Sequence, residues 1–138
     1  MTPTKLLHPV LCLLALLLGQ RPGAAQDPFA AAEQELTKKT VSTLLTFADT
    51  ARSSKVGQRA KQAFDLVLAY DPENSRARTE LGYRKDKGKW IEMPPEKRKK
   101  WADKANYEAR FKVADEWYKT AMKLGELHRT LGLKMKEA

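Results

Sequence analysis

Between residues 27 and 68, apolar side chains recur at intervals of three and four positions, which places them on one side of an α-helix. The pattern is interrupted once, at Ser53-Ser54-Lys55. The stripe before the interruption consists of Phe29, Leu36, Val41, Leu44, Phe47, Ala48 and Ala51, and the stripe after it of Val56, Ala60, Ala63, Phe64, Val67 and Leu68. Asp27-Pro28 supplies a capping side chain and a fixed φ for a helix start. The sequence therefore predicts two amphipathic helices that fold back antiparallel on each other.

The pattern changes after Asp71-Pro72, where the second stripe stops. Asn74-Ser75 is expected to cap a short third helix, which Gly82 ends. In residues 83–94 the helical period is lost, and Lys87-Gly88 is a turn signal between aromatic and basic positions. We expect a short aromatic loop or a small β-hairpin there, with its aromatic side chains folded back on the helices.

Proline interrupts the chain again at Met93-Pro94-Pro95, and Pro95 fits the first turn of a last helix. Residues 95–138 are therefore expected to form one long amphipathic helix. Its apolar side carries Trp101, Ala105, Val113, Ala114, Trp117, Ala121, Leu124, Leu127 and Leu131. The whole pattern predicts an all-α fold made of an antiparallel helical hairpin, a short aromatic loop or β-hairpin, and a long C-terminal helix.

The second helix carries the residue spacing of a tetratricopeptide repeat (TPR). Phe64 follows Ala60 by four positions, Pro72 follows after eight more, and Leu81-Gly82 falls where the next repeat has its Leu-Gly pair. The repeat length is about 34 residues, and Phe47-Ala48 lies one such length before Leu81-Gly82. It is the equivalent pair of a large and a small residue in the first helix. Residues 26–82 thus resemble a TPR-like hairpin followed by the start of a second repeat.

The resemblance covers roughly residues 41–82, and some of its usual aromatic positions differ. Leu44 and Arg78 stand where the repeat has tryptophan, and Ala51 and Lys85 stand where it has tyrosine. A single repeat of this kind leaves apolar helix faces exposed, and a neighbouring repeat or another helix must cover them. The resemblance therefore implies a module for protein–protein interaction whose array is completed by the last helix or by a partner.

A shorter resemblance involves Leu81-Gly82-Tyr83 together with Gly88-Lys89-Trp90. These residues are similar to a segment that follows helical repeats in exported bacterial proteins, some of which carry a later enzymatic domain. The resemblance implies, as an alternative, that the chain is the N-terminal accessory region of a larger exported enzyme.

Residues 1–25 have the pattern of a cleavable signal peptide. Lys5 precedes an unbroken apolar run from Val10 to Leu18, which is shorter than the roughly 20 residues of a membrane-spanning helix. Gly23-Ala24-Ala25 supplies the small side chains that signal cleavage needs, so we expect the chain to be cut after Ala25. Cys12 lies inside the run rather than at its end, so it does not fit a lipidation site. The mature chain is then expected to be exported without cysteine, to a bacterial periplasm or cell surface.

The 138-residue chain has a formal net charge of +9, and most of the excess remains after cleavage near Ala25. Eight cations cluster within residues 84–100: Arg84, Lys85, Lys87, Lys89, Lys97, Arg98, Lys99 and Lys100. Such a patch attracts polyanions. Because export disfavours nucleic acid as the partner, an anionic envelope polymer or a lipid surface fits it better. A solvated basic loop explains the same pattern.

Residues for catalysis or metal binding are scarce. His128 is the only histidine after residue 25, whereas a Ser-His-Asp site needs a histidine held by an acid, and zinc normally needs several His or Cys ligands. Asp115 and Glu116 are adjacent on a helix and point in different directions. The sequence predicts no enzyme activity, no cofactor and no metal site.

The function expected from these observations is that of an exported, non-enzymatic scaffold or adaptor that binds proteins through helical surfaces. Its candidate partner-binding residues are Tyr83, Trp90, Trp101 and Trp117. Each of them also fits a role in the core, and self-association through the last helix is a further alternative.

Overall fold

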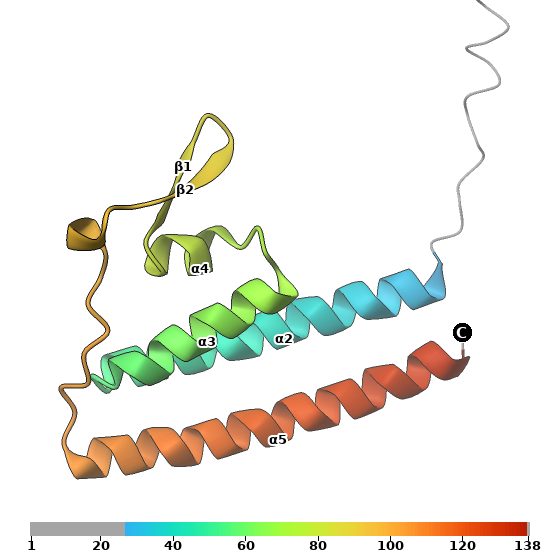
Figure 1. The fold of residues 1–138 in the computed structure, drawn as a ribbon. Helices are drawn as coiled ribbons and strands as arrows, with labels where there is room; N and C mark the ends of the chain where they lie inside the picture. The colour runs from blue at the N-terminus through green and yellow to red at the C-terminus, as the bar shows by residue number, and fades with distance from the viewer. Residues whose placement is uncertain (1–26, 138) are drawn as a thin grey trace, which may run out of the picture.

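The computed structural model describes residues 27–137, which form a mainly α-helical fold (Figure 1). The predicted signal peptide, residues 1–25, lies outside the described residues. The elements are α2 (Pro28–Ser53), α3 (Gly57–Tyr70), α4 (Ser75–Glu80), β1 (Tyr83–Asp86), β2 (Lys89–Glu92), a 3-10 turn (Pro95–Lys97) and α5 (Tyr107–Glu137). The mainly helical class predicted from the sequence is confirmed.

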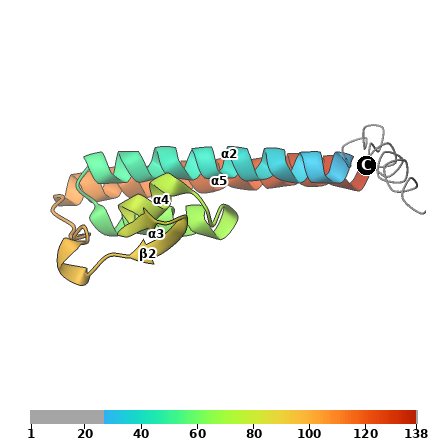
Figure 2. The ribbon, with the colours of Figure 1, turned by 90° about the horizontal axis from the view of Figure 1, so that it is seen from above.

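Helix α2 lies at the centre of the fold, and both α3 and α5 pack against it. α3 folds back antiparallel on α2, as predicted, and α5 runs antiparallel along another side of α2 (Figure 1). The start of α2 and the end of α5 therefore lie at the same end of the molecule in both views (Figure 2). Within residues 27–137, no helix combines the length and the apolar character needed to cross a membrane.

The core is built from the two apolar stripes of the helical hairpin. Phe64 and Ala48 are fully buried, and Leu44 and Phe47 are 1% and 3% exposed. Alanines at the contact allow the helices to approach closely, and the aromatic and aliphatic side chains fill the space beside them. From α5, Val113 joins this core, and Trp117 and Leu124 pack against its edge.

Local capping sets the helix starts. The Asp27 carboxylate accepts from the backbone N–H of Phe29 at 3.0 Å, and Asn74 Oδ1 accepts from Ala77 N–H at 3.0 Å. Both satisfy backbone donors that a helix leaves unpaired in its first turn. These two starts agree with the sequence prediction.

The segment after α4 is a β-hairpin, one of the two alternatives predicted for residues 83–94. Strands β1 and β2 pair antiparallel, with Lys85 opposite Trp90. Lys87 and Gly88 have φ of 46° and 82°. Two consecutive positive φ values define the two-residue turn whose twist matches that of paired strands.

The last helix begins at Tyr107, so the prediction that it starts at Pro95 was wrong. Pro95 begins only a short 3-10 turn, and Arg98 is extended, with φ −83° and ψ 151°. Asn106 supplies the cap instead, since its Oδ1 accepts from Ala109 N–H at 2.9 Å. We call residues 98–106 the strap, because they run from the 3-10 turn to α5 across the start of α3.

The strap is fixed by contacts with residues far away in the sequence. Asp103 pairs with Val56 in a β-bridge, and the Asp103 carboxylate accepts from Gln58 N–H at 2.9 Å. Val56, the residue before α3, provides no side-chain cap. Asp103 therefore caps α3 from a distant part of the chain, which a local reading of the sequence does not reveal.

Candidate functional site

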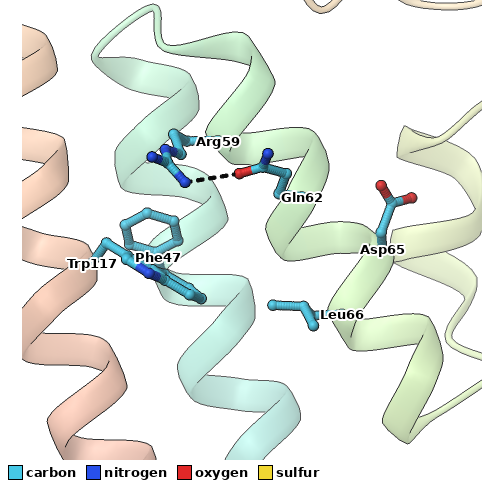
Figure 3. Close-up of a pocket in the computed structure, with 6 residues that line it drawn as sticks. All are labelled: Phe47, Arg59, Gln62, Asp65, Leu66 and Trp117. Atoms are coloured by element: carbon cyan, nitrogen blue, oxygen red, sulfur yellow. Dashed lines mark hydrogen bonds between the residues drawn. The ribbon is translucent and has the colours of Figure 1, made fainter.

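An open groove runs over α2 between α3 and α5 (Figure 3). Its volume is about 390 Å³, and its lining comprises Phe47 of α2, Arg59, Gln62, Asp65 and Leu66 of α3, and Trp117 of α5. The groove exists because α3 and α5 both pack on α2 and leave a hollow above it. Because aromatic and aliphatic side chains line it, we take it as the candidate binding site.

The floor of the groove is aromatic. The ring centres of Phe47 and Trp117 lie 4.9 Å apart at an angle of 56°, a tilted contact that favours aromatic pairs. Phe47 is almost fully buried, whereas Trp117 is half-buried and exposes part of its ring to the groove. Trp117 therefore belongs both to the core and to the groove surface.

The α3 side of the groove combines an apolar side chain with a polar rim. Leu66 is 38% exposed and points toward the groove (Figure 3). Arg59 donates to the Gln62 side-chain oxygen at 3.1 Å, and Asp65 pairs with Lys61 at 2.8 Å. An apolar floor with charged groups at the rim suits apolar side chains of a partner.

Trp101, a predicted partner-binding residue, lies in the strap rather than on α5. Its ring centre is 5.9 Å from that of Phe64, and it is half-buried against the core. The prediction that Trp101 lies on the apolar side of the last helix was therefore wrong, because that helix begins only after the Asn106 cap.

Tyr83 and Trp90, the other two predicted aromatic residues, contact α4 and the turn that precedes it. The Arg78 guanidinium lies 4.9 Å from the centre of the Tyr83 ring. The Trp90 indole N–H donates to the Glu73 carboxylate at 3.0 Å. Both are half-buried and fix the β-hairpin to the helices, so the structure does not bring the four predicted aromatics together on one surface.

The eight predicted cations separate into two groups. Arg84, Lys85, Lys87 and Lys89 are all exposed on the β-hairpin, and the Lys85 ammonium lies 5.5 Å from the centre of the Trp90 ring. Lys97, Lys99 and Lys100 are exposed in the 3-10 turn and the strap.

Two of the strap cations have structural partners. Arg98 pairs with Glu92 at 2.7 Å, and its side chain packs where a Cβ on Gly82 would stand. Lys99 pairs with Glu80. These two cations hold the strap against the hairpin and α4. The other exposed cations of the patch are the four on the β-hairpin together with Lys97 and Lys100.

Glu80 connects three parts of the fold. Its carboxylate accepts from Arg52 of α2 at 2.7 Å and from Lys99 of the strap. Burial raises the pKa of Glu80, but the hydrogen bonds and charges of Lys99 and Arg52 outweigh it and hold the pKa below its ordinary value of 4.5. Glu80 therefore links α2, α4 and the strap as an ionised acceptor.

His128 lies on α5, where its Nε2 is 3.4 Å from the Tyr70 hydroxyl of α3. Among residues 27–137, no three His, Cys, Asp or Glu side chains are grouped so that they could hold a metal ion. Asp115 and Glu116 both pair with Lys119, at 2.8 and 2.9 Å.

Sequence reasoning missed the α3 residues of the groove, which are Arg59, Gln62, Asp65 and Leu66. Leu66 stands beside Val67 and Leu68, and three consecutive apolar residues cannot all face the core of one helix. That run was a usable signal for an exposed apolar side chain on α3.

Comparisons of this chain with protein-family models, with curated proteins and with solved structures give no match. Its function is therefore argued from the residues and geometry described above.

Proposed function

We propose that this chain is a non-enzymatic, exported module that binds a protein partner through the groove between α3 and α5. The observation that carries the proposal is the make-up of the groove, with an aromatic floor of Phe47 and Trp117, the exposed Leu66, and charges confined to its rim. Concave surfaces with aromatic and aliphatic anchors and a polar rim are typical of protein interfaces.

The partner that fits the groove is an amphipathic helix with apolar anchors on one face. Arg59 and Asp65 stand at different heights along α3 and can align such a helix by opposite charges (Figure 3). An acidic group near Arg59 and a basic group near Asp65 complement this rim.

The finer architecture belongs to the same proposal: α2 and α3 form one TPR-like repeat, and α4 begins a second. Burial of Ala48, Ala60 and Phe64 supports it, because these are the positions on which the resemblance rests. Helix α5 then takes the place of further repeats by covering α2. Export rests on the sequence of residues 1–25.

The first experiment compares two substitutions of exposed apolar residues. Leu66→Glu places a charge in the groove, whereas Ile91→Glu places one on the β-hairpin, where Ile91 is 41% exposed. Immobilised residues 26–138 are incubated with an extract of the envelope fraction and washed across a salt series. We expect a protein that the wild type and Ile91→Glu retain at high salt and that Leu66→Glu loses at least tenfold.

The same experiment tests the second candidate function, an electrostatic binder of anionic envelope polymer or lipid. The exposed cations of the β-hairpin favour it. Material that leaves at moderate salt, survives Leu66→Glu and is lost in Lys87→Ala with Lys89→Ala supports this function and contradicts the groove. The hairpin lysines are better targets than Arg98 and Lys99, which hold the strap.

A further inference from the structure

Helix α5 carries a second apolar stripe that faces away from α2. Tyr107, Phe111, Tyr118 and Met122 are 84%, 67%, 64% and 60% exposed. The residues that pack on the core, such as Val113 and Leu124, lie on a different side of the same helix. Isolated exposed apolar residues are ordinary, but four large ones along a single helix face are not.

Apart from Met122, which lies at its edge, the exposed stripe follows the heptad spacing of helices that pair with one another. Steps of four and three residues alternate without a break along Tyr107, Phe111, Ala114, Tyr118, Ala121, Gly125, His128 and Gly132. Large side chains dominate its first half. Its second half carries small ones apart from His128, which is half-buried and lies against Tyr70 of α3. An antiparallel copy of the helix places Tyr107 opposite Gly132 and Tyr118 opposite Ala121, so these two rings meet small residues. The same register places Phe111 opposite His128.

The glycines of the stripe have no explanation inside the fold. A Cβ on Gly125 or Gly132 would meet nothing within 4 Å. A glycine inside a helix costs about 1 kcal/mol relative to alanine. Space left for the side chains of a facing helix accounts for both positions.

Charges along one edge of the stripe are complementary in the same antiparallel arrangement. The edge carries Glu108 and Asp115 in its first half and Arg129 and Lys136 in its second half. The first three of these also form ion pairs within α5, with Lys112, Lys119 and Glu126. Antiparallel pairing brings the acidic half of one helix beside the basic half of the other. A parallel pair would instead place aromatic rings opposite aromatic rings.

We propose that a second copy of this chain docks on the exposed stripe, giving a twofold dimer in which two α5 helices pair antiparallel about a point between residues 119 and 120. Three aromatic side chains per copy that bury about 150 Å² each give an interface on the order of 1,000 Å². That size meets the lower bound for specific association and predicts a weak dimer. The interface is separate from the α3 face of the groove and does not rest on the proposed function.

The test starts with sedimentation equilibrium of residues 26–138 over a concentration series. We expect the wild type to dimerise with rising concentration, and Tyr118→Glu to stay monomeric with an unchanged circular dichroism spectrum. Ile91→Glu, the matched control on the hairpin, keeps the dimer. A wild type that is monomeric throughout, or a dimer that Tyr118→Glu leaves intact, overturns the proposal.

Charge exchange separates specific pairing from loss of folding. A variant with Glu108→Lys and Asp115→Lys, and another with Arg129→Glu and Lys136→Glu, each set like charges against each other and should be monomeric. Mixed together, they should form a heterodimer. Failure of the mixture to associate contradicts the antiparallel arrangement.

Disulfide trapping can show whether the two helices run parallel or antiparallel. The method is suitable because the predicted mature chain contains no cysteine of its own. Ala114→Cys faces Gly125→Cys in the proposed dimer, so oxidation of the mixture should link the two variants. In an antiparallel dimer of either variant alone, the thiols of the two copies lie about 16 Å apart along the helix axis. Strong linkage of Ala114→Cys with itself would show a parallel pair and overturn the proposal.

Discussion

At the scale of one residue, Thr40 is a position where a buried polar group lowers the stability of the fold. It is fully buried in α2, and its hydroxyl has no hydrogen-bond partner among residues 27–137. Thr46 and Thr50 of the same helix instead donate to carbonyl oxygens four residues earlier, at 3.0 and 3.1 Å. A buried hydroxyl without a partner loses its hydration and gains nothing in return.

We therefore expect Thr40→Val, which exchanges the hydroxyl for a methyl group of similar size, to raise the free energy of unfolding by about 1 kcal/mol. Urea denaturation followed by circular dichroism measures the change. Thr46→Val is the matched control, since it removes a hydrogen bond and should give no gain. A loss of stability in Thr40→Val would show that the hydroxyl has a partner in solution.

At the scale of elements, the crossing of the strap over α3 depends on one glycine. A Cβ on Gly57 would stand 2.8 Å from the Ala102 carbonyl oxygen and 2.9 Å from the Trp101 carbonyl carbon. Both are backbone atoms, so a side chain there would displace the strap and loosen the Asp103 cap of α3.

Gly57→Ala should lower the free energy of unfolding by about 1–2 kcal/mol, even though alanine favours a helix more than glycine does. Gly125→Ala, in open space on α5, is the matched control and should raise stability by about 1 kcal/mol in dilute, monomeric protein. Thermal or urea denaturation of both variants compares the two effects. Equal stabilisation by both would mean that the strap does not pack on α3.

At the scale of the whole molecule, Glu80 links α2, α4 and the strap, and this link makes stability depend on pH. The folded protein holds the pKa of Glu80 below 4.5, so the unfolded chain takes up the proton first as the pH falls. The contribution of the carboxylate is therefore present above pH 4.5 and is lost as the pH falls through the folded pKa.

Glu80→Gln should lower the free energy of unfolding by about 1 kcal/mol at neutral pH. The difference from the wild type should shrink toward zero as the pH falls below 4.5. Urea denaturation of the wild type and Glu80→Gln at several pH values measures this difference. Because the other carboxylates are present in both proteins, their contributions cancel. A difference that is constant with pH would indicate a packing effect and not an ionic link.

The sequence by itself determined the features that depend on neighbouring residues. The Asp27 and Asn74 caps, the stripes of α2 and α3, and the turn at Lys87-Gly88 follow from local dihedral preferences and helical periodicity. These are settled within a few residues of chain, so spacing alone revealed them.

The tertiary structure alone decided the features that need residues distant in the sequence. Pro95 looked like a helix start, but its neighbours extend into a strap, because Trp101 and Asp103 gain contacts with Phe64 and the first turn of α3. The apolar residues of α5 looked like one stripe, yet Trp117 packs on α2 while Ala114 and Ala121 are exposed. Periodicity places apolar residues on a helix, but only packing selects which of them another helix covers, since that depends on where the rest of the chain folds.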